Sequence, residues 1–152
     1  FHAMEARSQL RHRPTSEGNF LKYNTAMSSL DNPLWDYATA VYARPEVAAA
    51  CLRLQDQQGL DADILLACAW AASLGYRLTL EDAAALDAIA GPLRADAIHP
   101  IRELRRRAAA DSARFPGLKE KLLAAELQAE RIEIAALHEY LREKMLAAPS
   151  QG

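Results

Sequence analysis

The chain has 152 residues, with 18 Lys plus Arg against 20 Asp plus Glu and a formal net charge of −2. A chain of this length can bury about 70% of its unfolded surface in one domain, without needing a disulfide or a metal for support. The hydrophobic fraction of 51% excludes wholesale disorder, and the near-neutral charge argues against a protein whose main task is to coat nucleic acid.

Helix-forming residues dominate the composition. There are 32 alanines but only two valines and six isoleucines, and β-branched residues are the ones that favour strands. We therefore predict an all-α fold, a single-domain bundle of about six helices that ends in a long helical hairpin. The longest apolar run, residues 64–72, is far shorter than the 18 or so residues of a membrane span, and no secretion signal precedes it. We expect no membrane association and a cytoplasmic location in a bacterium.

The expected domain organisation has three parts. Residues 1–26 show little apolar periodicity and contain Pro14, Gly18 and Asn19, which suggests a disordered leader or a vector-derived segment. Residues 27–146 form the helical domain, and residues 147–152 form a flexible tail.

Cap residues and prolines place the first three helices. Asn32 caps a helix over residues 33–43, and a second helix runs from Pro45 to a left-handed stop at Gly59. The third helix follows the cap Asp61 and is apolar nearly all round, so it belongs in the centre of the bundle.

Two further helices are expected before the hairpin turn. One follows Thr79 and ends at Ala90, because Gly91 and Pro92 break it. The next covers residues 93–110, with a kink near His99 because Pro100 cannot donate a backbone hydrogen bond.

The last expected helix, residues 118–146, is about 43 Å long at 1.5 Å per residue. That length exceeds a compact small bundle, so its final turns project or pair with another chain.

Charged side chains form one stripe on each arm of the predicted hairpin. Three carboxylates share a stripe on the last helix, and three arginines form a ridge on the helix before it. Folding at Pro116 and Gly117 brings the two stripes together, which predicts an interhelical ladder of ion pairs; the alternative is that both stripes are solvated surface. The residues are Arg102, Arg105, Arg106, Glu126, Glu130 and Glu133.

Catalytic and metal signatures are not recognised. The paired Glu-x-x-His motifs of di-iron bundles do not occur; Asp96 and His99 give a single Asp-x-x-His, and His138 follows Glu133 by five residues, on the wrong face. Neither Cys51 nor Cys68 has metal-ligand spacing. We expect no catalytic residue, cofactor or metal, and enzyme activity is left open with a leaning towards none.

Nucleic acid is one class of partner that the charge distribution could serve. Residues 92–124 carry eight basic and four acidic side chains, so basic charge gathers there. However, residues 105–107 spread over about 200° of helix, and no aromatic residues are interleaved among them. Trp35 and Tyr37 are candidate aromatic contacts, although aromatics at helical spacing usually form core.

Four segments resemble a proteobacterial family of short, helical cytoplasmic proteins classed as a domain of unknown function. They are Asn-Pro-Leu-Trp-Asp-Tyr at 32–37, the apolar helix around Trp70, Pro-Ile-Arg-Glu-Leu-Arg-Arg at 100–106 and Ala-Ala-Glu-Leu-Gln-Ala-Glu-Arg at 124–131. The resemblance covers about residues 27–146; it implies a helical fold and a cytoplasmic location, and supplies no activity.

The leading functional hypothesis is a non-enzymatic helical interaction or adaptor module. Its partner is an unidentified protein, or a second copy bound through the last helix. The alternative is a nucleic-acid-binding regulator that uses the arginine ridge.

Overall fold

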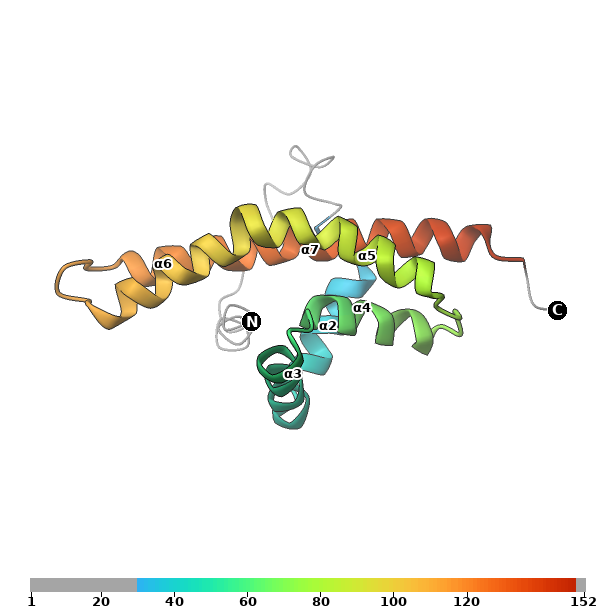
Figure 1. Ribbon diagram of the computed structural model, residues 1–152, viewed down its shortest axis with the longest axis horizontal. Coiled ribbons are helices and arrows are strands. Elements are labelled where there is room, and N and C mark those ends of the chain that lie inside the picture. Colours follow the sequence, from blue (N-terminus) through green and yellow to red (C-terminus); the bar gives the residue numbers. More distant parts are fainter. Residues whose placement is uncertain (1–29, 150–152) are drawn as a thin grey trace, which may run out of the picture.

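A computed structural model describes residues 30–149 of the chain (Figure 1). These residues form helices and no strands, so the predicted all-α fold is confirmed. The expected leader, residues 1–26, and the end of the expected tail lie outside the described residues. In chain order the elements are α2 (Pro33–Tyr42), α3 (Pro45–Gln58), α4 (Ala62–Ser73), α5 (Leu80–Leu93), the π-helix η1 (Arg94–Ile98), α6 (His99–Ala110) and α7 (Leu118–Ala147).

Local capping explains where most of these helices begin. The Asn32 side chain accepts a hydrogen bond from the backbone N–H of Trp35 at 2.9 Å, and Asp61 does the same for α4. Thr79 and Asp82 form a reciprocal capping box at the start of α5. Gly59 ends α3 with φ at 64°, the left-handed conformation that glycine adopts without strain.

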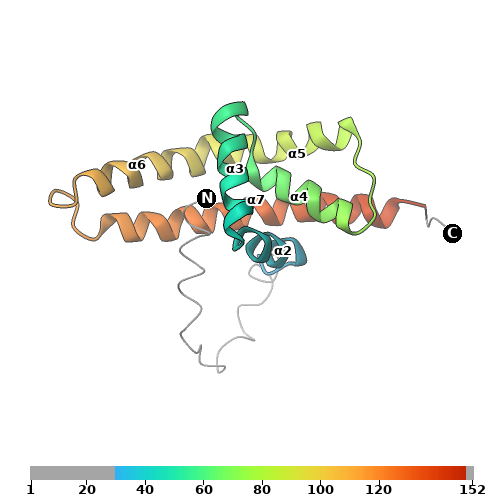
Figure 2. The ribbon, with the colours of Figure 1, turned by 90° about the horizontal axis from the view of Figure 1, so that it is seen from below.

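The longest helix, α7, organises the molecule. Helices α5 and α6 and the π-helix η1 lie along it, and α2 and α4 pack against its C-terminal half (Figures 1 and 2). Helix α3 packs on α2 and α4. The apolar core lies where α2, α4, α5 and α7 meet, and its fully buried large side chains are Leu34, Trp35, Leu86, Ile134, Leu137 and Leu141.

The predicted break at Gly91 and Pro92 is wrong. Gly91 keeps a negative φ and Pro92 lies inside α5, which continues to Leu93 because its packing along α7 outweighs the local breakers. The irregularity falls instead at η1, whose last hydrogen bond runs from the His99 N–H to the carbonyl of Arg94, five residues back. Since Pro100 has no N–H and clashes with the carbonyl four residues before it, a wider π turn accommodates this proline.

The hairpin of α6 and α7 extends beyond the rest of the fold. Both views show α6 and the first half of α7 side by side, leading away from α2, α3 and α4 (Figures 1 and 2). Among the described elements, α6 packs only against α7 and against η1, which it continues. Within residues 30–149, every helix is too short or too polar to cross a lipid bilayer.

Candidate functional site

Arginines of α6 and glutamates of α7 form a buried network within the hairpin. Glu126 is fully buried and accepts hydrogen bonds from Nε of Arg102, at 2.8 Å, and from Nε of Arg105. Arg102 Nη2 also lies 3.3 Å from Glu130 Oε1. Burial on its own raises the pKa of Glu126, but the hydrogen bonds from Arg105 and Arg102 outweigh burial and lower it. Glu126 is therefore held as a carboxylate.

Two members of the expected ladder lie elsewhere. Arg106 is exposed on the outer face of α6, because the 100° step between residues turns it away from α7 when Arg105 faces inward. Glu133 is buried, but it lies two turns beyond Glu126 along α7, beside the N-terminus of α4. Its neighbours are aspartates.

Glu133, Asp61 and Asp63 form what we term the carboxylate cluster. One carboxylate oxygen from each residue lies within 4.8 Å of the others. Asp61 is the N-cap of α4 and Asp63 lies in its first turn, while Glu133 comes from the middle of α7. Asp63 and Glu133 are only 5% and 1% exposed. The packing of α4 on α7 therefore brings three acidic groups into the interior.

Some oxygens of the carboxylate cluster accept hydrogen bonds or ion pairs, and others have no hydrogen-bond donor. Asp61 Oδ1 accepts from the backbone N–H of Asp63 at 2.7 Å, and its Oδ2 lies 2.7 Å from Nη1 of Arg94. Arg94 also contacts Asp87 at 2.8 Å. Asp63 Oδ1 and Glu133 Oε1 are buried and have no hydrogen-bond partner among residues 30–149. Two buried acceptors thus lack a donor.

Burial and mutual repulsion disfavour charge on these acids. Burial, followed by the negative charges of Asp63 and Asp61, raises the pKa of Glu133 to about 11. The pKa of Asp63 is also raised well above its usual value, by burial and then by Glu130 and Asp61. When all three cluster acids are ionised, Arg94 is the guanidinium bonded to them, and the local charge is −2. A positively charged ligand would relieve this imbalance.

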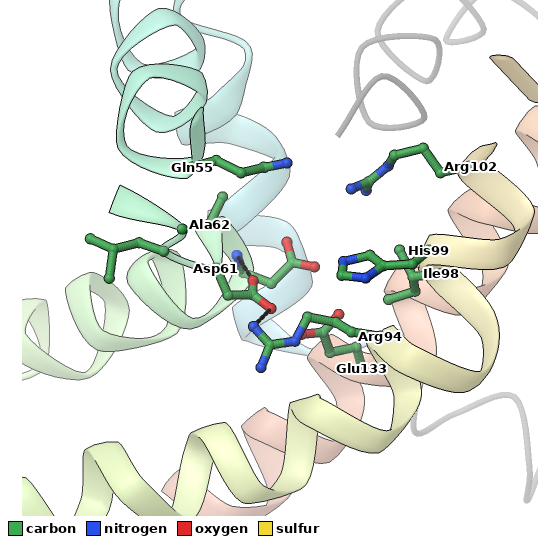
Figure 3. Close-up of a pocket in the computed structure, with 11 residues that line it drawn as sticks. Gln55, Asp61, Ala62, Arg94, Ile98, His99, Arg102 and Glu133 are labelled. Carbon is green, nitrogen blue, oxygen red and sulfur yellow. Dashed lines mark hydrogen bonds and ion pairs between the residues drawn. The ribbon is translucent and has the colours of Figure 1, made fainter. Parts of the chain in front are cut away.

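A cavity of about 270 Å³ opens onto the carboxylate cluster. Figure 3 shows Gln55 and Asp61 on one side of this cavity, His99 and Arg102 facing them, and Arg94 beside Glu133. Burial, then the charges of Arg102 and Arg94, lower the pKa of His99, so its imidazole is neutral at physiological pH. The π-helix η1 contributes Arg94 and Ile98 to the wall, and π turns often occur at functional sites.

Two of the three cluster residues are not among the site residues that the sequence predicts. The sequence pattern marks Asp61 only as a helix cap and assigns no role to Asp63. One signal was available: Asp63 lies in a helix that is apolar nearly all round, so its carboxylate had to be buried. The expected absence of a metal site rested on motifs within single helices, and such motifs cannot reveal a cluster shared by α4 and α7.

The candidate aromatic contacts belong mainly to the core. Trp35 is fully buried, and the Arg131 guanidinium lies 5.2 Å from the centre of its ring. Tyr37 is half-buried and packs against the same core. Trp35 therefore belongs to the core, the alternative that its helical spacing favours, and its side chain has no exposed area with which to meet a partner.

These features define a class: a small all-α protein with a charged interior and a projecting helical hairpin. The chain belongs to the family described as "Protein of unknown function (DUF2390)", which matches residues 33–137. The match includes the carboxylate cluster and the arginine–glutamate network. No curated protein and no solved structure matches the chain.

Proposed function

We propose that this protein is a non-enzymatic helical interaction module that binds another protein through the α6–α7 hairpin, residues 99–125. The observation that carries the proposal is the packing of α6, which contacts only α7 and η1 among the described elements. Domains normally bury helix faces between several elements, and a pair of helices standing alone leaves faces for a partner to cover.

Apolar side chains of the hairpin remain partly accessible. Leu104 on α6 is 40% exposed. Three leucines of the first two turns of α7 are half-buried, since one neighbouring helix covers only part of each: Leu118, Leu122 and Leu123. A third helix laid along the pair would bury the rest of this area, as in the recognition of amphipathic helices by grooves.

The charge of the hairpin indicates what kind of helix would bind. Five basic side chains are exposed between residues 103 and 124, against three acidic ones. They are Arg106, Arg107, Arg114, Lys119 and Lys121, opposed by Glu103, Asp111 and Glu120. A partner helix with an acidic flank complements this surface, whereas a second copy would bring two surfaces of net positive charge together. We therefore favour a different protein over self-association.

Nucleic acid is the weaker alternative for the same surface. Two of the three ridge arginines, half-buried Arg102 and buried Arg105, are bonded to Glu126 inside the hairpin, so they are poorly available to phosphates. Arg106 remains exposed. A small number of scattered basic groups supports only weak, salt-sensitive binding.

The test compares affinity purifications from native lysate, with and without nuclease treatment, for three tagged full-length chains: wild type, Leu104→Asp and Leu80→Asp. Leu80 is 90% exposed at the start of α5, away from the hairpin, and so provides a matched control. We expect one protein to be recovered with wild type and Leu80→Asp but lost with Leu104→Asp, while circular dichroism shows that all three chains stay helical.

Three results would count against this proposal. They are equal recovery with both variants, recovery that disappears when nuclease is added, and a dimer in sedimentation that Leu104→Asp dissociates with no other protein bound. The second result favours nucleic acid, and the third favours a second copy of the chain.

A further inference from the structure

We propose that Asp61, Asp63 and Glu133 bind one hard divalent cation, of the Mg²⁺, Mn²⁺ or Ca²⁺ type, in the cavity between α4, η1 and α7. Each residue would supply one carboxylate oxygen. The inference is independent of the proposed partner, because the carboxylate cluster lies in the body of the protein and Leu104 lies on the hairpin.

The spacing of the three oxygens suits such an ion. They lie within 4.8 Å of one another. Oxygens on opposite sides of a cation are about 4.2 Å apart for Mg²⁺ and about 4.8 Å apart for Ca²⁺, given metal–oxygen distances near 2.1 and 2.4 Å. All three oxygens therefore lie within the greatest separation that one Ca²⁺ allows, and any pair more than about 4.2 Å apart would have to move closer to bind Mg²⁺.

The donor-free oxygens provide a second, separate observation. Glu133 Oε1 and Asp63 Oδ1 are buried without a hydrogen-bond donor among the described residues, and both side chains line the cavity. A buried acceptor without a donor is costly, and the cost is greater when the acceptor is charged. A bound cation would satisfy both oxygens at once.

The net charge of the carboxylate cluster with Arg94 and the volume of the cavity both suit one divalent ion. Three carboxylates and Arg94 sum to −2, and Arg102 is already bonded to Glu126 and Glu130. A cation of charge +2 makes the group neutral. The cavity of about 270 Å³ also leaves room for coordinating waters, each of which takes about 30 Å³. Three carboxylates with no thiolate favour hard cations over zinc.

A proton shared by Asp63 and Glu133 is the competing explanation, because two adjacent carboxyl groups can be stabilised by protonation of one of them. A protein stabilised in this way would show no affinity for a cation. Direct measurement of cation binding therefore separates the two explanations.

The experiment uses the full-length chain with no affinity tag, first stripped with EDTA and then titrated with MnCl₂ at pH 8. Electron paramagnetic resonance reports free Mn²⁺, and competition with Mg²⁺ and with Ca²⁺ identifies which hard cation the site prefers. We expect one Mn²⁺ per chain and a rise in melting temperature on binding. Glu133→Gln keeps the shape of the side chain, and we expect it to weaken binding about tenfold or more.

Glu139→Gln is the matched control. Glu139 lies on the same helix but is exposed and bonded to Arg142, so we expect this variant to bind Mn²⁺ as wild type does. Asp63→Asn is the second test variant, for use if Glu133→Gln does not fold. Wild type that binds none of the three cations at millimolar concentration would overturn the inference, as would unchanged binding by Glu133→Gln or Asp63→Asn. Leu104→Asp should bind Mn²⁺ normally, so failure of the partner proposal and failure of this one are distinguishable.

Discussion

Arg102 and Glu126 are 24 residues apart in the sequence, yet Arg102 Nε lies 2.8 Å from Glu126 Oε1 across the interface of α6 and α7. Arg105 bonds to the other oxygen of the same carboxylate. This fully buried acid therefore joins two turns of α6 to α7 near the point where the hairpin leaves the body of the protein. Because α6 contacts only α7 and η1 among the described elements, the ion pairs bear directly on the stability of the hairpin.

Replacing Glu126 by Ala should be strongly destabilising. The change leaves the guanidinium groups of buried Arg105 and half-buried Arg102 without their main acceptor, and breaking a buried pair in this way costs about 3–5 kcal/mol. Urea unfolding followed by circular dichroism measures the loss. Glu139→Ala removes an exposed ion pair with Arg142 and should leave the urea midpoint nearly unchanged. Equal effects of the two changes would contradict this account of the network.

Replacing Tyr140 by Phe should lower the free energy of unfolding by about 1.5 kcal/mol at pH 7. The Tyr140 hydroxyl donates to Asp82 Oδ1 at 2.8 Å, and hydrogen bonds to a charged group are worth about this much. Tyr76→Phe removes a longer contact of 3.2 Å to the other oxygen of Asp82, so its effect should be smaller.

The effect of Tyr140→Phe should depend on pH. Burial alone raises the pKa of Asp82, but hydrogen bonds from the Thr79 N–H, from Tyr140 and from other donors outweigh burial and lower it. The contribution of this carboxylate is therefore present above its unfolded pKa of about 3.9 and is lost as the pH falls through the lowered folded value. The pKa of Tyr140 is raised to about 12, so at the alkaline end the contribution disappears only between about pH 10 and 12.

Urea titrations of wild type and Tyr140→Phe at several pH values measure this dependence. The difference between the two proteins should be constant from about pH 5 to 9 and should shrink at both extremes. A difference that stays the same from pH 3 to 7 would show that Asp82 does not carry the effect.

Alanine at two glycines should have opposite effects on stability. Gly117 has φ at 73°, which costs an L-residue about 1–2 kcal/mol, although an added Cβ would meet no atom within 4 Å. Gly91 is helical, and an added Cβ would lie 3.9 Å from Arg94 Nη2, an ordinary contact. Gly91→Ala should therefore stabilise the protein by about 0.5–1 kcal/mol. Thermal unfolding measures both changes, and stabilisation by Gly117→Ala would be inconsistent with a left-handed turn there.

Both cysteines should react slowly with a thiol reagent. Burial, and next the charge of Asp63, raises the pKa of Cys51; burial, and next Asp82, does the same for Cys68. Cys51 is buried and Cys68 is half-buried. At pH 7.5 a disulfide reagent should modify Cys51 far more slowly in the folded chain than after denaturation, and Cys68 at an intermediate rate. Fast modification of Cys51 in the folded chain would mean that α3 is not packed against α2 and α4.

Cap residues in the sequence predicted where the helices begin, but the residues around Pro92 did not predict that α5 continues through this proline. Asn32, Asp61 and Thr79 act on backbone groups within three residues of themselves, so each helix start could be inferred from its own neighbourhood. Pro92 was expected to end its helix for an equally local reason. Packing along α7 keeps that helix continuous, and packing against a distant helix cannot be inferred from the residues around one proline.

Only the contacts between the two neighbouring helices of the hairpin could be predicted from the sequence. Glu126 and Arg105 could be placed together because a tight turn at Gly117 fixes which faces of two neighbouring helices meet. The carboxylate cluster joins α4 to α7 across about 70 residues of sequence, and its partners depend on how those helices cross.

The amino-acid sequence thus determined the helices of this protein, their caps and the charged interior of its hairpin, because short-range hydrogen bonds and helical periodicity act within one or two elements. The tertiary structure decided that Glu133 meets Asp61 and Asp63, that Trp35 is fully buried and that α5 continues through Pro92. Each of these depends on the packing of helices that are distant in sequence, and that packing is chosen by the whole core at once.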